Sequence, residues 1–330
     1  MSPCSTWIEN ILLSEPRAAE KAFRLWRESF DLDKVEGDCL AILPILSDKI
    51  AEWLSREPKT VQERKLLGIC RRGWALNQLR YREAIQAVKA LRTAGVEPTL
   101  IFGAVAWALL YEEKGAVRPI EGIDILVRRE HGTSALRALE GLGWSLEPGM
   151  PIPEGPVLHN VGGVWLRSRS SSSLRLAWRL MSVPPEMAQA HEVFPSCLDI
   201  ELQGTHTLVL PTEELLRDAL TRERDALVSW RCDALVLLRN RTVDWGLLKR
   251  LIRDFPAAQT RLDQLRSEAG ATIPPGILDW RQPGRLRRRF SRIWVDYKRV
   301  SWARSQTTSL PRFAAYLFQR LSHSMNERTP

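Results

Sequence analysis

One stretch of the sequence, residues 99–127, constrains the fold more than any other. Thr99–Phe102 is a short run of β-type residues, Gly103 interrupts it, and Ala104–Tyr111 is apolar throughout, as expected of a buried helix. A charged loop follows, and Ile123–Val127 is a second β-type run. A strand, a glycine turn, a helix and another strand predict a small sheet with helices packed to one side.

The residues before this unit are predicted to be helical. Apolar side chains recur at three-to-four spacing in two stretches, and each stretch is expected to bury one stripe. The first stripe is Ala19, Ala22, Phe23, Trp26 and Phe30, and the second is Leu67, Cys70, Trp74, Leu76 and Leu79. Pro58 and Gly95 are helix breakers that bracket one long helix. Tryptophans on apolar stripes are expected in the core: Trp26, Trp74, Trp107, Trp178, Trp230 and Trp245.

The residues after this unit divide into a mixed region and a second helical region. A helix is predicted at about Glu130–Leu142, and strands are predicted at Pro156–Asn160, Val164–Arg167, Leu174–Leu180, Leu198–Leu202 and Thr207–Leu210. Helical spacing returns at Pro211 and continues to about Leu265. We therefore predict an α+β fold. A small mixed sheet with helices occupies residues 95–210, flanked by helical regions at 1–94 and 211–330.

The glycine turn and the second strand together indicate a site for a phosphorylated ligand. Backbone N–H groups at a helix start bind phosphate, and Gly103 and Ala104 lie at such a start. Two carboxylates at alternate positions of a strand share one face and can share Mg²⁺. Here Glu121 lies just before the second β run, Asp124 lies within it, and Gly122 is at the position two residues before Asp124.

The order of elements resembles the bacterial proteins called uncharacterised nucleotidyltransferases, a branch of the polymerase-β-like superfamily. That branch has a Lys-Gly turn, a Tyr at the helix end, an Arg before an Asp-x-Asp pair, and a third Asp on a later strand. The matching positions here are Gly103, Tyr111, Arg118, Pro119, Asp124, Leu126, Val127 and Gly143. Further matches are Trp178-Arg179-Leu180, Leu210-Pro211, Asp233 and Val243-Asp244-Trp245.

The resemblance implies transfer of a nucleotidyl or phosphoryl group from an NTP, with Mg²⁺, to a hydroxyl of a small molecule, sugar or peptide. Gly103 and Ala104 would then line the phosphates, and Asp124 would hold the metal. Glu121 would stand in as a second catalytic and metal-binding acid. Arg118 would either face phosphate or pair with Glu121, and Asp233 is expected to bond an arginine or a backbone group.

The departures from the resemblance fall on the catalytic positions. Phe102 replaces the Lys, Gly122 the first Asp, Arg175 the third Asp and Ala177 a His, so Asp124 is the one expected metal carboxylate that remains. Asp199 or Glu201 could supply another acid, although an exposed edge strand explains this pair more simply. The chain is therefore an impaired transferase or a catalytically inactive scaffold for a protein or peptide partner.

The net charge of +9 is concentrated at the end of the chain. Residues 281–330 contain 12 Lys/Arg against 2 acids. Arg285–Arg299 is a basic amphipathic stretch that could bind an anionic surface, a nucleic acid or an acidic partner, or pack on the preceding helices. The longest charge-free apolar stretch, Pro98–Tyr111, has 14 residues, whereas a spanning helix needs about 20. With no signal-peptide pattern near Glu9, we predict a cytoplasmic protein without a transmembrane segment.

Overall fold

A computed structural model describes residues 3–29, 31–35, 37–54, 60–113, 115–148, 162–180, 194–222, 227–253, 255–269 and 273–274. The strand predicted at Pro156–Asn160 and the basic stretch Arg285–Arg299 lie outside these residues.

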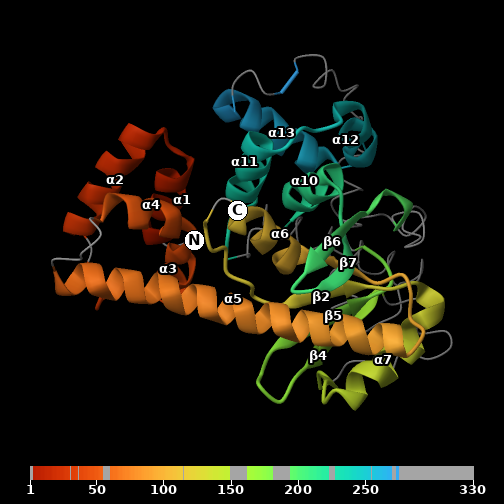
Figure 1. Cartoon of the computed structure of the whole chain (residues 1–330). Coiled ribbons are helices and arrows are strands. Elements are labelled where there is room, and N and C mark those ends of the chain that lie inside the picture. Colours follow the sequence, from red (N-terminus) through yellow and green to blue (C-terminus); the bar gives the residue numbers. More distant parts are fainter. Residues whose placement is uncertain are drawn as a thin grey trace, which may run out of the picture.

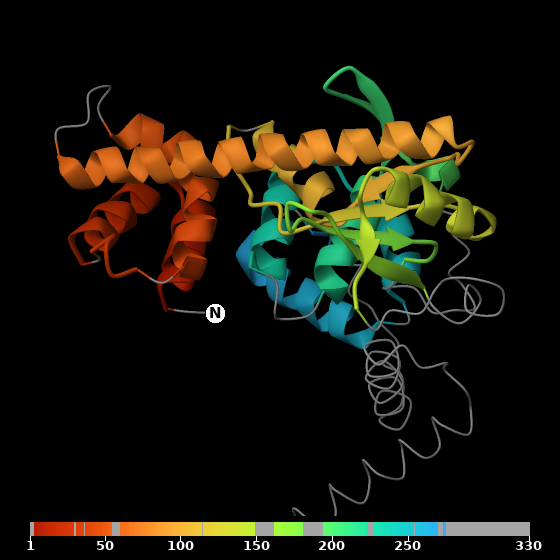
Figure 2. The same cartoon turned by 90° about the horizontal axis from the view of Figure 1, so that it is seen from below.

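The N-terminal helices lie beside the first half of one long helix, α5 (Figures 1 and 2). They are α1 (Pro3–Leu13), α2 (Pro16–Ser29), α3 (Gly37–Ile42), the short 3₁₀ helix η1 (Leu43–Leu46) and α4 (Ser47–Trp53), and α5 spans Val61–Thr93. A capping box starts α5, because the Thr60 hydroxyl accepts from the Glu63 N–H while the Glu63 carboxylate accepts from the Thr60 N–H. The long helix predicted between Pro58 and Gly95 is confirmed.

Seven strands in the described part of the chain form one mixed sheet in the order β3-β4-β5-β2-β1-β7-β6. Their bounds are β1 (Leu100–Phe102), β2 (Ile123–Leu126), β3 (Ser145–Leu146), β4 (Gly163–Arg167), β5 (Ser173–Ala177), β6 (Leu198–Leu202) and β7 (Thr205–Val209). Strands β1 and β7 are parallel, as are β2 and β5, and the other neighbours are antiparallel. The two central strands are therefore those of the predicted strand–helix–strand unit.

Helices cover both faces of this sheet, which corrects the prediction of helices on one side only. The physical reason is that the central strands carry apolar side chains on both faces, as Leu100 and Ile101 do on β1. One face packs against the second half of α5 and α7 (Gly132–Gly141), with η2 (Arg129–His131) leading into α7. The other packs against α6 (Gly103–Glu112) and the C-terminal helices α10 (Thr212–Thr221), α11 (Trp230–Asn240), α12 (Trp245–Ile252) and α13 (Pro256–Ala269). A short 3₁₀ helix, η3 (Phe194–Ser196), precedes β6. Because side chains alternate along a strand, Ile101 lies in the core on the α5 and α7 face, and Phe102 lies in the core on the face of the C-terminal helices.

These elements confirm the predicted α+β class, with a mixed sheet between two helical regions. Strand β6 has the predicted bounds, whereas the two-residue β3 was not predicted. The region boundaries at residues 94 and 210 remain predictions. None of the helices in the described ranges combines the length and the apolar character that crossing a bilayer requires.

The second apolar stripe is a correction to the sequence analysis. Trp74, Leu76 and Leu79 are 52%, 49% and 53% exposed. Cys70 of this stripe is buried as predicted, and the rest of the buried face of α5 includes Leu66 and Tyr81. The physical reason is that α5 carries apolar residues around much of its circumference, so its neighbours decide which face is covered. Of the other expected core tryptophans, Trp26, Trp107 and Trp178 are buried, and Trp230 and Trp245 are half-buried.

Candidate functional site

A row of four side chains crosses the middle of the sheet. Trp165 on β4 pairs with Arg175 on β5, Arg175 pairs with Asp124 on β2, and Asp124 pairs with Phe102 on β1. Residues in register on adjacent strands have side chains on the same face. This is the face on which Phe102 packs toward α6 and the C-terminal helices. The row therefore lies between the sheet and those helices.

Arg175 and Asp124 form an ion pair at the centre of the row. The Arg175 Nε–H donates to Asp124 Oδ1 at 2.7 Å, and the two side chains are 16% and 14% exposed. The guanidinium carbon lies 4.8 Å from the centre of the Phe102 ring and 5.6 Å from that of Trp165. Both distances allow a cation–π attraction. A carboxylate and two aromatic rings thus fix the orientation of Arg175.

Asp124 also contacts the start of α6. The backbone N–H of Ala104 donates to its carboxylate, which places a negative charge at the positive end of the helix. Gly103 has a φ of +61°, and a Cβ there would lie 1.9 Å from Asp124 Oδ2. Only glycine allows this approach. Burial raises the pKa of Asp124 above its usual value, and the nearby Arg175 only partly opposes this rise.

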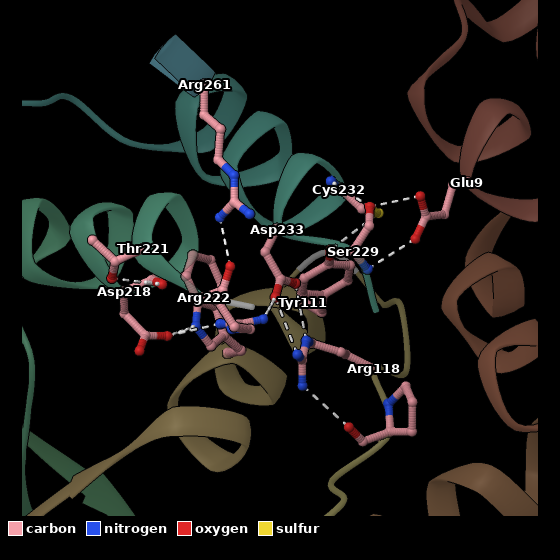
Figure 3. A network of polar contacts seen from close by, with 12 residues as sticks. Glu9, Tyr111, Arg118, Asp218, Thr221, Arg222, Ser229, Cys232, Asp233 and Arg261 are labelled. Carbon is pink, nitrogen blue, oxygen red and sulfur yellow. Dashed lines mark hydrogen bonds and ion pairs between the residues drawn. The ribbon is translucent and has the colours of Figure 1, made fainter. Parts of the chain in front are cut away.

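A second polar cluster continues from α10 to α11 (Figure 3). Asp218 accepts from Trp107 Nε1 at 3.1 Å and from Arg222 Nη2 at 2.7 Å. Arg222 also donates to Asp233, which accepts from Arg118 Nε at 2.9 Å and from Arg118 Nη2 at 3.0 Å. Burial alone would raise the pKa of Asp218, but Arg222 and the two hydrogen bonds hold this pKa below its usual value. Charges of opposite sign therefore alternate through the cluster.

The same view shows how α1 joins this cluster (Figure 3). The Glu9 carboxylate accepts from the Ser229 N–H at 2.9 Å and from the Ser229 hydroxyl at 2.6 Å. Ser229 in turn caps α11 through Cys232 N, one residue before Asp233. The Tyr111 hydroxyl lies 3.4 Å from Cys232 Sγ, and burial raises the pKa of both groups. The N-terminal helices are thus attached to the helix that anchors Arg118.

The residues of the row do not fit Mg²⁺. Asp124 already accepts from a guanidinium and a helix N–H, and Arg175 adds a positive charge beside it. Glu121 is exposed, and Gly122 contributes no side chain. Across the described ranges, no group of three or more His, Cys, Asp or Glu residues is arranged to hold a metal ion. Octahedral Mg²⁺ sites use carboxylate oxygens that are free to bind the ion.

The structure brings three of the five predicted site residues together. Gly103, Ala104 and Asp124 meet at the start of α6. Within the described part of the chain, no hydrogen bond or ion pair joins Glu121 or Arg118 to Asp124. Arg118 is 2% exposed and pairs with Asp233, not with Glu121.

The expectation that Asp233 bonds an arginine is confirmed. The alternative acids, Asp199 and Glu201, are exposed on β6, which is the edge strand of the sheet.

Several residues of the two clusters had not been singled out in the sequence. Asp218 and Arg222 are spaced by four at the end of α10, and that spacing was a visible signal of an ion pair. Trp165 gave no signal of its own, because its role depends on register with Arg175. Arg175 was recognised as a departure, and the structure adds that it faces Asp124.

A separate hollow of about 400 Å³ lies away from this row. Residues from α5, the end of α7 and the β4–β5 turn line it, among them Glu83, Trp144 and Arg169. No residue of the row or of the second cluster lines this hollow. We therefore place the candidate site at the row, where the charged groups converge.

The chain is similar to one protein family and to a solved structure. A crystal structure of an antigenic nucleotidyltransferase-like protein from Paracoccidioides brasiliensis is similar, with 13% identity and a TM-score of 0.37 over 58% of this chain and 88% of that one. No curated protein matches the chain. Residues 40–260 match the family described as uncharacterised nucleotidyltransferase, and this range includes the row and the second cluster. The chain therefore belongs to the uncharacterised nucleotidyltransferase family.

Proposed function

We propose that this chain is a metal-independent, ligand-binding member of its family and that it has lost Mg²⁺-dependent transfer. The observation that carries the proposal is the 2.7 Å contact from Arg175 Nε to Asp124 Oδ1. Through this contact, the Arg175 guanidinium occupies Asp124, the one carboxylate left of the three that the family uses to bind metal. The fold is kept, and the chemistry at its centre is changed.

Electrostatics supports this proposal. Two unit charges 4 Å apart interact by about 4 kcal/mol at an effective dielectric constant of 20, so a divalent ion at that distance from Arg175 would be repelled by about 8 kcal/mol. Phosphoryl transfer relies on metal ions to neutralise the charge that develops on the phosphate oxygens. A row with one acid, already paired with one arginine, supplies too little negative charge to hold such an ion against this repulsion.

The competing function is transfer of a nucleotidyl or phosphoryl group from an NTP, with Mg²⁺, to a hydroxyl acceptor. It would require Asp124 to leave Arg175 and the exposed Glu121 to turn toward the row. It would also require the start of α6 to exchange the Asp124 carboxylate for phosphate. A protein or peptide partner for a non-catalytic form remains part of our proposal, without a surface assigned to it.

The test is titration calorimetry with a non-hydrolysable ATP or GTP analogue, with and without Mg²⁺. We expect no Mg²⁺-dependent binding by the wild-type chain. Micromolar binding that needs Mg²⁺ and disappears in Asp124→Ala would refute the proposal and restore the transferase.

A variant designed to restore metal binding provides a second test of the proposal. The double variant Gly122→Asp/Arg175→Asp puts acids on both sides of Asp124, one two residues earlier on the chain and one in register on β5. A Cβ at Gly122 would lie 3.4 Å from its nearest atom, the Ser173 carbonyl oxygen, which is an ordinary van der Waals contact. We expect this variant to bind Mn²⁺ and Gly122→Asp alone to bind it far more weakly. Equal Mn²⁺ binding by the wild-type chain would contradict the proposed role of Arg175.

A further inference from the structure

Arg175 is held on one side and open on the other. Its Nε–H is bonded to Asp124, and its guanidinium lies against Phe102 and Trp165. Within the described residues, its two terminal nitrogens donate to no protein group, and its side chain keeps 16% of its surface exposed. The two terminal nitrogens of a guanidinium match the two oxygens of a phosphate or carboxylate. The row thus presents an oriented, unfilled pair of donors.

We propose that Arg175 binds the phosphoryl group of a phosphate monoester without any metal ion. This inference rests on the proposed metal-independent function and names the ligand class of the same site. Asp124, Phe102 and Trp165 position Arg175, so it loses little side-chain freedom when the ligand arrives. The guanidinium supplies the positive charge that binds the phosphoryl oxygens.

The charge of the surrounding groups favours a ligand of low charge. The ion pairs of the row and of the second cluster contain three arginines and three aspartates: Arg118, Arg175, Arg222, Asp124, Asp218 and Asp233. Their formal charges cancel. A triphosphate of charge near −4 would therefore meet no net positive field, whereas a single phosphoryl group needs only the two donors of Arg175. We expect monophosphates to bind more tightly than ATP when no divalent ion is present.

Substitution of Asp124 tests this inference, because a metal site and the proposed site predict opposite changes in ligand binding. In a metal site, Asp124→Asn would weaken ligand binding because a ligand of the metal is lost. In the proposed site, the Asp124 carboxylate repels the incoming phosphoryl group, so its neutralisation should tighten binding, by up to about tenfold for charges some 6 Å apart in a screened site. Asparagine keeps an acceptor oxygen for the Arg175 Nε–H. The two kinds of site therefore predict changes in opposite directions.

The experiment is calorimetry of the full chain with inorganic phosphate, AMP and ATP in EDTA. We expect binding of phosphate and AMP, at least tenfold weaker binding in Arg175→Lys, and tighter binding in Asp124→Asn. Lysine keeps the charge and loses the paired donors, so this variant separates geometry from charge. Arg167→Lys is the matched control, because Arg167 is 53% exposed on β4, pairs with Glu147, and should not change binding. Circular dichroism and melting curves confirm that each variant is folded.

The outcomes separate this inference from the proposed function. If AMP binds more tightly than inorganic phosphate, the site binds the phosphoryl group of a nucleotide. If the two bind equally, the site binds a phosphate ester without recognising its organic part. Absence of phosphate and AMP binding in EDTA, or binding unchanged in Arg175→Lys, overturns the inference and leaves the metal-independent function standing. Binding that requires Mg²⁺ and is lost in Asp124→Asn overturns both.

Discussion

Replacement of Asp233 by asparagine should destabilise the fold strongly. Asp233 is fully buried and accepts from Arg118 and Arg222, whose side chains are 2% and 17% exposed. The variant keeps the shape of the side chain but leaves the buried Arg118 without its carboxylate and Arg222 with Asp218 alone. Breaking a buried ion pair in this way costs about 3–5 kcal/mol of unfolding free energy. We expect the thermal midpoint to fall by at least about 6 °C.

An exposed ion pair provides the control for this measurement. Arg241 and Glu113 are 2.5 Å apart, and their side chains are 45% and 49% exposed. Glu113→Gln should change the unfolding free energy by less than about 1 kcal/mol, because water screens such pairs. Denaturant unfolding of both variants measures the difference. If Asp233→Asn is no less stable than Glu113→Gln, the ion pairs that Asp233 makes with Arg118 and Arg222 do not contribute the stability expected of a buried network.

Two further predictions concern a glycine and a buried acid. Gly103→Ala should lower the unfolding free energy by about 2 kcal/mol or more, because its Cβ would collide with Asp124 at a positive φ. Gly68→Ala in α5, where a Cβ would meet no atom within 4 Å, should raise the unfolding free energy by up to about 1 kcal/mol. Denaturant unfolding of the two variants measures the sign of each change. Burial raises the pKa of Glu9 above 4.5 even though Ser229 donates two hydrogen bonds to it. The folded chain therefore binds this proton more tightly than the unfolded chain, so the stability of the wild type relative to Glu9→Gln should rise as pH falls from 7 toward 4.5. A fall in the stability of the wild type relative to Glu9→Gln over this range would contradict the raised pKa of Glu9.

The fold could be predicted where local signals were strong. Pro58 and Gly95 marked the ends of α5, and the change of period after Gly95 marked the start of the sheet. The buried face of α5 could not be predicted, because Trp74 and Leu79 are as apolar as the side chains that are covered. Which apolar residues are buried depends on where η1 and the sheet lie against the helix, and that is a property of the tertiary structure.

In the candidate site, too, local signals in the sequence predicted some residues, and the tertiary structure determined the contacts of the others. Gly103 and Asp124 could be found from the strand–turn–helix pattern and the resemblance. The partner of Arg118 could not, because Asp233 is 115 residues away and Glu121 is only three. Spacing along the chain favours the near acid, whereas burial requires the one that accepts two hydrogen bonds with good geometry. The orientation of Arg175 likewise depended on the register between β2 and β5.

The contact between Glu9 and Ser229 has a consequence for synthesis of the chain. The two residues are 220 positions apart, so at about 5–20 residues per second the ribosome needs roughly 11–44 s to make Ser229 after Glu9. During this interval α1 has no α11 to pack against. Its apolar residues Ile8 and Ile11, both fully buried in the folded protein, then lack part of the packing that buries them. Nascent chains of this protein should therefore engage chaperones early, and slower translation should lengthen that dependence.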